Sequence, residues 1–173
     1  MRILVTGGVR SGKSRHAEAL LDSAGRVTYL APGRPADGSD PDWDDRVAQH
    51  RARRPADWLT VETADLPAAL RDVEGAVLVD CLGTWLTAQL DDGLWDASTD
   101  DARRAVEVSV AALCEALVDV PDAVVVTNEV GLGVVPSHRS GALFRDLLGT
   151  VNQQVAAVCD ELHLVIAGRV LRL

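Results

Sequence analysis

Short runs of apolar residues recur along the chain, separated by longer segments in which apolar positions follow helical spacing. The runs are RILVT (2–6), VTYLA (27–31), WLTVE (58–62), AVLVD (76–80), AVVVT (123–127) and LHLVIA (162–167). Uninterrupted apolar runs rich in branched side chains are typical of strands that are buried on both faces, as in parallel sheets. The pattern therefore predicts six strands of a mostly parallel sheet.

Two of the intervening segments predict amphipathic helices. Residues 140–159 carry apolar side chains at helical spacing: Leu143, Phe144, Leu147, Leu148, Val151, Val155 and Val158. Residues 101–118 predict a second helix, and Ser98 and Asp101 have the spacing of a capping box ahead of it. Strands that alternate with crossover helices indicate an α/β fold with a doubly wound sheet. A chain of 173 residues suits one sizeable core, so we expect a single domain over 1–173.

Composition excludes several classes of function. The chain has 17 Lys and Arg against 26 Asp and Glu, a formal net charge of −9, which argues against nonspecific binding to nucleic acid or anionic membranes. The first apolar run is too short for a signal peptide and no run is long enough to span a bilayer, so we expect a cytoplasmic protein without membrane insertion. Three widely spaced cysteines suggest neither a zinc site nor a disulfide framework.

The segment GGVRSGKS follows the first predicted strand and precedes a helical stretch, RHAEALL (15–21). This context makes a Walker A phosphate-binding loop credible, whereas the alternative is a glycine-rich turn without a ligand. In such a loop, backbone N–H groups and a helix N-terminus face phosphate oxygens, the lysine neutralises β- and γ-phosphate charge, and the serine hydroxyl binds Mg²⁺. The predicted phosphate-binding residues are Gly7, Gly8, Val9, Arg10, Ser11, Gly12, Lys13 and Ser14.

A magnesium site needs a further oxygen ligand, and Asp80 supplies a candidate. It ends the buried run AVLVD, which is the form of a Walker B element, where a carboxylate holds the metal directly or through water. An aspartate at a strand end is more often a helix cap or a turn residue when no phosphate-binding loop accompanies it. Together with the Walker A segment, the sequence predicts Ser14 and Asp80 as the metal ligands.

A basic cluster stands out in this acidic chain, within DDRVAQHRARRPADW (44–58). Its members are Arg46, His50, Arg51, Arg53 and Arg54. Helical spacing places Arg46, His50, Arg53 and Arg54 on roughly one face, just before Pro55, which should end the helix. Flanking cations would favour a neutral imidazole that can attack phosphorus and would stabilise the phosphate in transit. The alternative is a solvated helix end whose arginines complement the helix dipole.

A third glycine-containing segment, VVVTNEVGLGVVP (124–136), runs from a strand into Asn128 and Glu129. The carboxyl ends of parallel strands line the ligand crevice, so both side chains could reach substrate. A structural turn is the alternative interpretation. GLG lacks the remaining spacing of a dinucleotide-binding fingerprint, so that kind of site is not indicated.

These segments together resemble one family closely. ILVTGGVRSGKSRHAEAL, RVAQHRARRPADWLTVE, LVDCLGTWLT and TNEVGLGVVP, followed by FRDLLGTVNQ, occur in the order and spacing of the bifunctional adenosylcobinamide kinase and adenosylcobinamide-phosphate guanylyltransferase family. The resemblance covers essentially the whole chain and implies a RecA-like P-loop fold and a homotrimer. It also implies two reactions of cobalamin biosynthesis. A nucleoside triphosphate phosphorylates adenosylcobinamide, and GMP is then transferred from GTP to that phosphate through a GMP-histidine intermediate, giving adenosylcobinamide-GDP and pyrophosphate.

The resemblance also implies roles for individual residues. His50 aligns with the histidine that carries GMP, and the segment Gly7–Ser14, with Lys13, holds the triphosphate. The implied nucleotide-binding residues beyond that segment are Arg51, Ala52, Arg53, Arg54, Glu62 and Asp80. GTP and ATP are the implied nucleotide substrates, Mg²⁺ the implied metal, and adenosylcobinamide and its phosphate the implied acceptors.

The chain departs from the family pattern at three positions. Pro32 stands where family members commonly carry threonine, Ala88 stands where asparagine is common, and Gly83 is atypical. These departures put contacts to the base or substrate in doubt. Two alternatives to the implied function remain open at this point: a P-loop kinase of small metabolites without guanylyltransferase activity, and a nucleotide-gated interaction protein.

Overall fold

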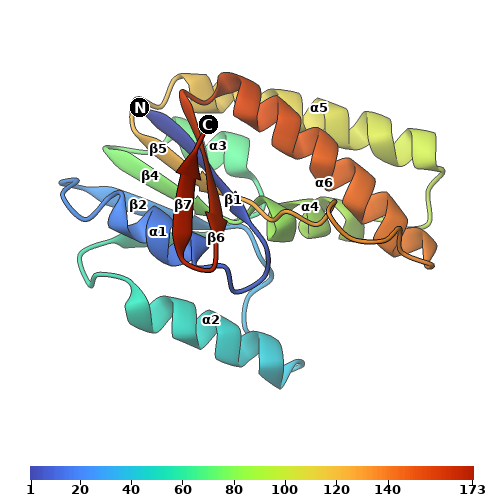
Figure 1. Cartoon of the computed structure of the whole chain (residues 1–173), viewed down its shortest axis with the longest axis horizontal. Helices are drawn as coiled ribbons and strands as arrows, with labels where there is room; N and C mark the ends of the chain where they lie inside the picture. The colour runs from blue at the N-terminus through green and yellow to red at the C-terminus, as the bar shows by residue number, and fades with distance from the viewer.

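The computed structural model describes residues 1–173, which form one seven-stranded sheet flanked by helices (Figure 1). In space the strands follow the order β3-β2-β4-β5-β1-β6-β7. The strands are β1 (Arg2–Gly7), β2 (Val27–Ala31), β3 (Leu59–Glu62), β4 (Ala76–Asp80), β5 (Ala123–Val126), β6 (Glu161–Ile166) and β7 (Arg169–Arg172). The helices are α1 (Lys13–Ala19), α2 (Pro41–Arg53), α3 (Leu66–Arg71), α4 (Leu82–Asp91), α5 (Thr99–Val118) and α6 (Arg139–Val158). The α/β fold and all six predicted strands are confirmed.

The first six strands pair in parallel, as the continuous apolar runs indicated. The seventh strand, β7, was not predicted from the sequence, and it pairs antiparallel with β6. A tight turn joins the two strands through Ala167 and Gly168, which have positive φ values of 49° and 75°. All four residues of β7 are exposed, and its sequence RVLR alternates too briefly between charged and apolar residues to stand out as an apolar run.

Helices cover the two faces of the sheet unequally. On one face, α3, α4, α5 and α6 pack against alternate strand residues in the larger apolar core. On the other face, Ala17 of α1 and Leu21, just after that helix, pack against the remaining strand residues. The two helices predicted most directly are α5 and α6, and Ser98 caps α5 by accepting a hydrogen bond from the Asp101 N–H at 3.1 Å. None of the helices is long and apolar enough to cross a membrane.

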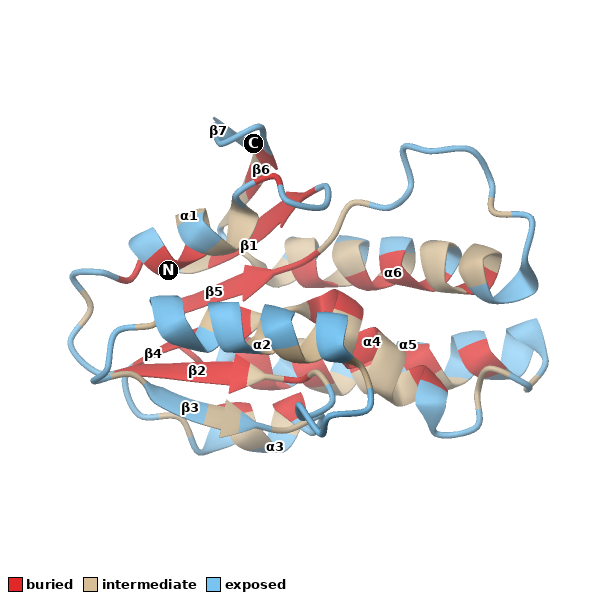
Figure 2. Ribbon diagram, turned by 90° about the horizontal axis from the view of Figure 1, so that it is seen from below, coloured by how far each residue is buried: buried red, intermediate tan, exposed pale blue.

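Helix α2 stands outside both apolar cores. It has no buried residue, and Figure 2 shows its turns exposed or partly exposed along their length. The helix ends at Arg53 as predicted, because Pro55 disfavours helical backbone at Arg54, which has an extended ψ of 140°. With so little apolar contact, polar interactions near the C-terminal end of α2 connect it to the sheet through Asp80 and to α1 through Glu18.

Candidate functional site

The segment Gly7–Ser14 joins the end of β1 to the start of α1, as a phosphate-binding loop requires. Gly12 precedes the helix with a φ of 97°, a left-handed conformation that favours glycine. The loop is tied to its surroundings by two backbone hydrogen bonds, from the Glu129 N–H to the Gly7 carbonyl at 3.1 Å and from the Gly168 N–H to the Ser11 carbonyl at 2.8 Å. The predicted phosphate loop is therefore built from strand, helix and two supporting loops.

Within the loop, the side chains divide into exposed and inward positions. Val9 and Arg10 are exposed, whereas Ser11 is buried. Lys13, at the first position of α1, donates from Nζ to the Gly8 carbonyl at 3.1 Å. That contact folds the ammonium group back over the loop, where it can neutralise a bound phosphate. Ser14 follows on the same first turn and faces Asp80 at the end of β4.

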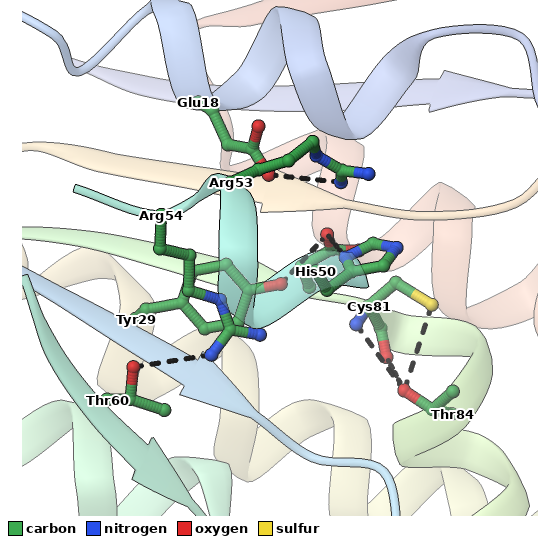
Figure 3. A network of polar contacts seen from close by, with 9 residues as sticks. Glu18, Tyr29, His50, Arg53, Arg54, Thr60, Cys81 and Thr84 are labelled. Atoms are coloured by element: carbon green, nitrogen blue, oxygen red, sulfur yellow. Dashed lines mark hydrogen bonds and ion pairs between the residues drawn. The ribbon is translucent and has the colours of Figure 1, made fainter. Parts of the chain in front are cut away.

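Asp80 is the meeting point of four elements. Its buried carboxylate accepts a hydrogen bond from the Tyr29 hydroxyl of β2 at 3.0 Å, measured to Oδ2, and the same oxygen lies 3.5 Å from Nδ1 of His50 in α2 (Figure 3). The Ser14 hydroxyl of α1 also contacts the carboxylate. Burial alone would raise the pKa of the Asp80 carboxyl, but its contacts with His50, Ser14 and Tyr29 outweigh burial and lower that pKa below its ordinary value.

The contact between Ser14 and Asp80 tests whether a magnesium ion fits here. Both groups are oxygen ligands of the kind that Mg²⁺ prefers, and the Ser14 hydroxyl lies close enough to the Asp80 carboxylate to lower its pKa. No cluster of three or more His, Cys, Asp or Glu side chains that could hold a metal ion by itself occurs in the structure. Magnesium in phosphoryl-transfer sites uses few protein ligands and takes the rest from phosphate and water, so the residues present fit that kind of site.

The position of His50 differs from the expected arginine-flanked environment. The charged group in contact with its ring is a carboxylate, Asp80, and no arginine forms a hydrogen bond or ion pair with the imidazole. About a quarter of the His50 side chain is exposed, 26%, so the ring is accessible. A carboxylate facing Nδ1 favours the tautomer with hydrogen on that nitrogen and leaves Nε2 with a free electron pair.

The arginines near the end of α2 are paired with neighbouring side chains and do not form one open cationic face. Arg53 contacts the buried Glu18 of α1 at 3.3 Å, and Arg51 pairs with Glu62, the last residue of β3. Arg46 is exposed and forms no ion pair, and Ala52 is exposed on the same helix. Arg46, His50 and Arg53 lie within α2 at the predicted helical spacing, whereas Arg54 lies beyond the last helical residue with an extended ψ of 140°, so the predicted face ends at Arg53.

Arg54 is the arginine that reaches furthest into the sheet. Its guanidinium lies 3.4 Å from the centroid of the Tyr29 ring, in a cation–π contact, and Nη1 donates to Thr60 Oγ1 at 3.3 Å. Burial, followed by the charge of Asp80, raises the pKa of Tyr29, so its hydroxyl keeps its proton and acts as a donor. Figure 3 shows the Arg54 guanidinium against the Tyr29 ring, with His50 on the side of the tyrosine hydroxyl.

An open hollow of about 540 Å³ lies beside this group, at the edge of the sheet formed by β3. Two predicted arginines and the predicted glutamate line it together with the short segment that links α2 to β3. The lining residues are Arg51, Arg54, Pro55, Ala56, Trp58, Thr60 and Glu62. A hollow of similar size lies at the opposite, amino-terminal end of the strands, around Arg26, Gly75 and Asp122, away from every predicted motif.

The strand-end segment after β5 reaches the phosphate loop through its backbone. Besides the bond from the Glu129 N–H to Gly7, the carbonyl of Asn128 accepts from Asn152 Nδ2 at 3.1 Å, and Glu129 Oε1 accepts from the Gly131 N–H at 2.8 Å. Asn128 Oδ1 is buried and has no partner in the chain. The segment therefore supports the phosphate loop as a turn, and it carries an unsatisfied polar atom in the same region.

The three departures from the family pattern fit the fold without distortion. Pro32 is buried directly after β2, and Ala88 is partly buried in α4. Gly83 is buried near the start of α4, where an added Cβ would lie 3.6 Å from Asn128 Cγ, an ordinary van der Waals contact. None of the three touches the contact between His50 and Asp80.

Sequence reasoning did not identify Tyr29 or Glu18, which contact the site residues. Tyr29 is the one tyrosine of the chain and the one aromatic residue of the run VTYLA, so a phenol group in a strand predicted to be buried was a usable signal. Glu18 is a buried carboxylate on α1, but nothing in its sequence neighbourhood indicates burial or its pairing with Arg53.

A solved ATPase from the type III secretion system of pathogenic bacteria has the same fold as this chain. The superposition has a TM-score of 0.55 at 16% identity, and it covers 94% of this chain and 50% of the ATPase. The chain thus spans about half the length of that protein. At this identity the likeness shows the fold alone.

Curated relatives match at much higher identity and along nearly their whole length. The bifunctional adenosylcobalamin biosynthesis protein CobU of Salmonella typhimurium is 40% identical over 185 residues, which covers 97% of each chain. The protein of the same name from Escherichia coli is 40% identical over 178 residues, again covering 97% of each chain. The corresponding protein CobP of Pseudomonas aeruginosa is 40% identical over 174 residues, covering 97% of this chain and 94% of that one.

A family model described as cobinamide kinase / cobinamide phosphate guanyltransferase matches residues 3–173. The matched range contains the phosphate loop, the helix with His50 and the strand that ends in Asp80. With this match and the three relatives, the chain belongs to the cobinamide kinase / cobinamide phosphate guanyltransferase family.

Proposed function

We propose that this protein phosphorylates adenosylcobinamide and then transfers GMP from GTP to the phosphate through His50, giving adenosylcobinamide-GDP and pyrophosphate. Family membership supports both activities. The observation that supports the residue assignment is the position of Asp80, whose carboxylate lies 3.5 Å from the His50 imidazole and also contacts Ser14 of the phosphate loop. One acidic side chain thereby links the proposed nucleophile to the proposed triphosphate site.

For the first reaction, residues Gly7–Ser14 hold the triphosphate of ATP or GTP. The acceptor hydroxyl of adenosylcobinamide attacks the γ-phosphorus and releases its proton to water, the bond between this phosphorus and the β–γ bridging oxygen breaks, and the nucleoside diphosphate leaves. Lys13 neutralises charge that spreads over the phosphate oxygens during the transfer. Its position over the loop, with Nζ hydrogen-bonded to the Gly8 carbonyl, is compatible with that role.

For the second reaction, Nε2 of His50 attacks the α-phosphorus of GTP. A nitrogen–phosphorus bond forms, the bond to the bridging oxygen breaks, and pyrophosphate leaves. A phosphate oxygen of adenosylcobinamide phosphate then attacks the same phosphorus, the nitrogen–phosphorus bond breaks, and neutral imidazole is restored. Throughout, the Nδ1 proton stays directed at Asp80, which orients the ring for both displacements.

Ser14 and Asp80 are the proposed ligands of Mg²⁺, together with phosphate oxygens and water. A bound magnesium ion would neutralise negative charge on the triphosphate in both reactions. Asp80 thus has two proposed roles: it binds Mg²⁺ together with Ser14, and it orients the His50 imidazole.

The remaining proposed nucleotide-binding residues lie around the hollow beside β3. Arg51 and Arg54 line it with Glu62, and Arg53 and Ala52 lie on the adjoining last turn of α2. Guanidinium groups suit phosphate oxygens, and a carboxylate suits the N–H groups of a purine or the hydroxyls of a ribose. We propose that this hollow receives part of the nucleotide.

The proposed domain organisation, cellular location and oligomeric state rest on the sequence and the family resemblance. We propose that residues 1–173 act as one catalytic domain, that the protein works in the cytoplasm, and that it assembles as a homotrimer. Nucleic acid and membranes are not proposed as partners, in keeping with the net charge of −9.

Intact-protein mass spectrometry after incubation with GTP and Mg²⁺, followed by peptide mapping, tests the transfer half. We expect one GMP adduct on His50, no adduct in His50→Ala, and residual cobinamide phosphorylation in that variant. Lys13→Ala should lose phosphorylation. Absence of an adduct in a protein that demonstrably binds GTP would leave the alternative, a P-loop kinase without guanylyltransferase activity.

A further inference from the structure

Tyr29 is a buried polar residue that the two reactions above do not use. It lies in the middle of β2, between β3 and β4 in the sheet, and only 1% of it is exposed. Its ring belongs to the smaller apolar core, together with Val27 and Leu78, so a phenylalanine would fill the same space. What tyrosine adds is a hydroxyl, and that hydroxyl donates to Asp80 Oδ2 at 3.0 Å.

The oxygen that Tyr29 contacts is the one that faces His50. Asp80 Oδ2 accepts a hydrogen bond from the Tyr29 hydroxyl and lies 3.5 Å from His50 Nδ1, so both residues contact the same oxygen (Figure 3). The terminal torsion of an aspartate side chain has a broad energy minimum, so each further contact restricts its rotation. Besides Ser14, the Tyr29 hydroxyl contacts the carboxylate from the rigid sheet, and its bond to Oδ2 keeps that oxygen directed at the imidazole.

The ring of Tyr29 also contacts the polypeptide that carries His50. Arg54 follows the last turn of α2, and its guanidinium lies 3.4 Å from the centroid of the tyrosine ring. Since α2 has no buried residue of its own, this stacking is one of the few contacts that place the helix end on the sheet. Tyr29 thus touches both sides of the contact between His50 and Asp80: the carboxylate through its hydroxyl and the helix through its ring.

We infer that Tyr29 is a positioning residue for guanylyl transfer, which holds Asp80 and the end of α2 so that the His50 imidazole keeps its Nδ1 towards Oδ2 and its Nε2 free. The inference rests on the proposed role of His50 as the nucleophile. Partners that orient a reacting group through an intermediate residue commonly change activity by about 10- to 100-fold when they are lost. Tyr29→Phe removes only the hydroxyl and keeps the ring beneath Arg54.

Single-turnover formation of the GMP adduct from GTP and Mg²⁺ tests the inference. In Tyr29→Phe we expect the maximal rate of adduct formation to fall about tenfold, with the GTP concentration at half-maximal rate changed by less than about twofold. Thr28→Val is the matched control, because Thr28 is a buried neighbour on the same strand whose hydroxyl makes no hydrogen bond to Asp80. It should form the adduct at the parental rate.

A second measurement reports on the imidazole without catalysis. Nitrogen-15 NMR of histidine-labelled protein distinguishes the two ring tautomers, and we expect the Nδ1–H tautomer of His50 to lose population in Tyr29→Phe but not in Thr28→Val. Parental adduct formation in Tyr29→Phe, or an effect confined to GTP binding, would overturn the inference and leave the proposed function standing. A parent protein that forms no adduct would overturn both.

Discussion

Nδ1 of His50 lies 3.5 Å from Oδ2 of Asp80, although His50 is on a helix with no buried residue and Asp80 ends a strand of the central sheet. The pairing joins the most exposed helix of the site to the carboxyl edge of the strands. Because Asp80 also contacts Ser14, a change at this carboxylate reaches both the phosphate loop and the histidine. Asp80 is therefore the position at which the two proposed reactions are most closely coupled.

Replacement of Asp80 by asparagine tests that coupling. Asp80→Asn keeps the size of the side chain but removes its charge, so we expect both cobinamide phosphorylation and GMP-adduct formation to fall by about tenfold or more, with a higher Mg²⁺ requirement. Rates measured across a magnesium titration report the change. The control is Asp72→Asn, on an exposed residue at the end of α3, which should behave like the parent. Loss of only one of the two activities would contradict a shared role for Asp80.

Two adjacent glycines of the phosphate loop should differ sharply in their tolerance of a methyl group. An added Cβ at Gly7 would lie 2.4 Å from the Val165 carbonyl oxygen and 2.7 Å from Ser11 Oγ, whereas nothing lies within 4 Å of the corresponding position at Gly8. Gly7→Ala should lower the free energy of unfolding by about 1–3 kcal/mol through overpacking against a backbone that cannot withdraw. Gly8→Ala should change it by less than about 1 kcal/mol. Urea denaturation of the two variants compares them directly, and equal stabilities would disprove the difference.

Asp160 links the beginning of β1 to the beginning of β6 and should contribute to acid sensitivity. The Arg2 N–H donates to Asp160 Oδ2 at 2.7 Å and Arg2 Nη2 donates to Oδ1 at 3.1 Å. These two bonds lower the pKa of Asp160 below its ordinary value of 3.8, and the bond from the backbone N–H has the larger effect. A carboxyl with a lowered folded-state pKa stabilises the protein above its unfolded-state pKa, and this contribution is lost as pH falls through the folded-state pKa.

Asp160→Asn should therefore be less stable than the parent at neutral pH and should lose less stability than the parent on acidification. Urea midpoints measured at about pH 7 and about pH 3 give the comparison. Asp57→Asn is the control, since its exposed carboxylate makes no hydrogen bond or ion pair. An identical acid response in Asp160→Asn and the parent would show that Arg2 does not stabilise the charged form.

Truncation of a side chain should lower the free energy of unfolding far more in the larger core than on the exposed surface of the helices that cover it. Leu148 of α6 is fully buried, at 0% exposure, whereas Val108 of α5 is 72% exposed. Leu148→Ala should lower the free energy of unfolding by about 2–5 kcal/mol through lost burial and a residual cavity, and Val108→Ala should change it by less than about 0.5 kcal/mol. Thermal and urea unfolding measure both variants, and a loss below about 1 kcal/mol at Leu148 would contradict its place in the core.

Local sequence pattern determined most of the fold of this protein. Six apolar runs became six parallel strands, and in β1, β2, β4 and β5 the apolar run reflects burial on both faces of the sheet, which local inspection detects. The phosphate loop was equally predictable, because its residues are contiguous and their backbone conformation depends on nearby glycines. The seventh strand escaped prediction because its exposed residues carry no such pattern, and its pairing depends on a turn at Ala167 and Gly168.

Only part of the candidate site could be predicted from the sequence. His50, Asp80 and the phosphate loop were identifiable one by one, from local pattern and family resemblance. Their mutual contacts were not, because the order of strands in space brings together segments that are distant in the chain. Three relationships were decided by the tertiary structure alone. The Asp80 carboxylate faces the His50 imidazole, the arginines at the end of α2 pair with separate partners, and the Tyr29 hydroxyl donates a hydrogen bond to Asp80. Such relationships depend on distances between elements, and helical spacing or residue order carries no information about those distances.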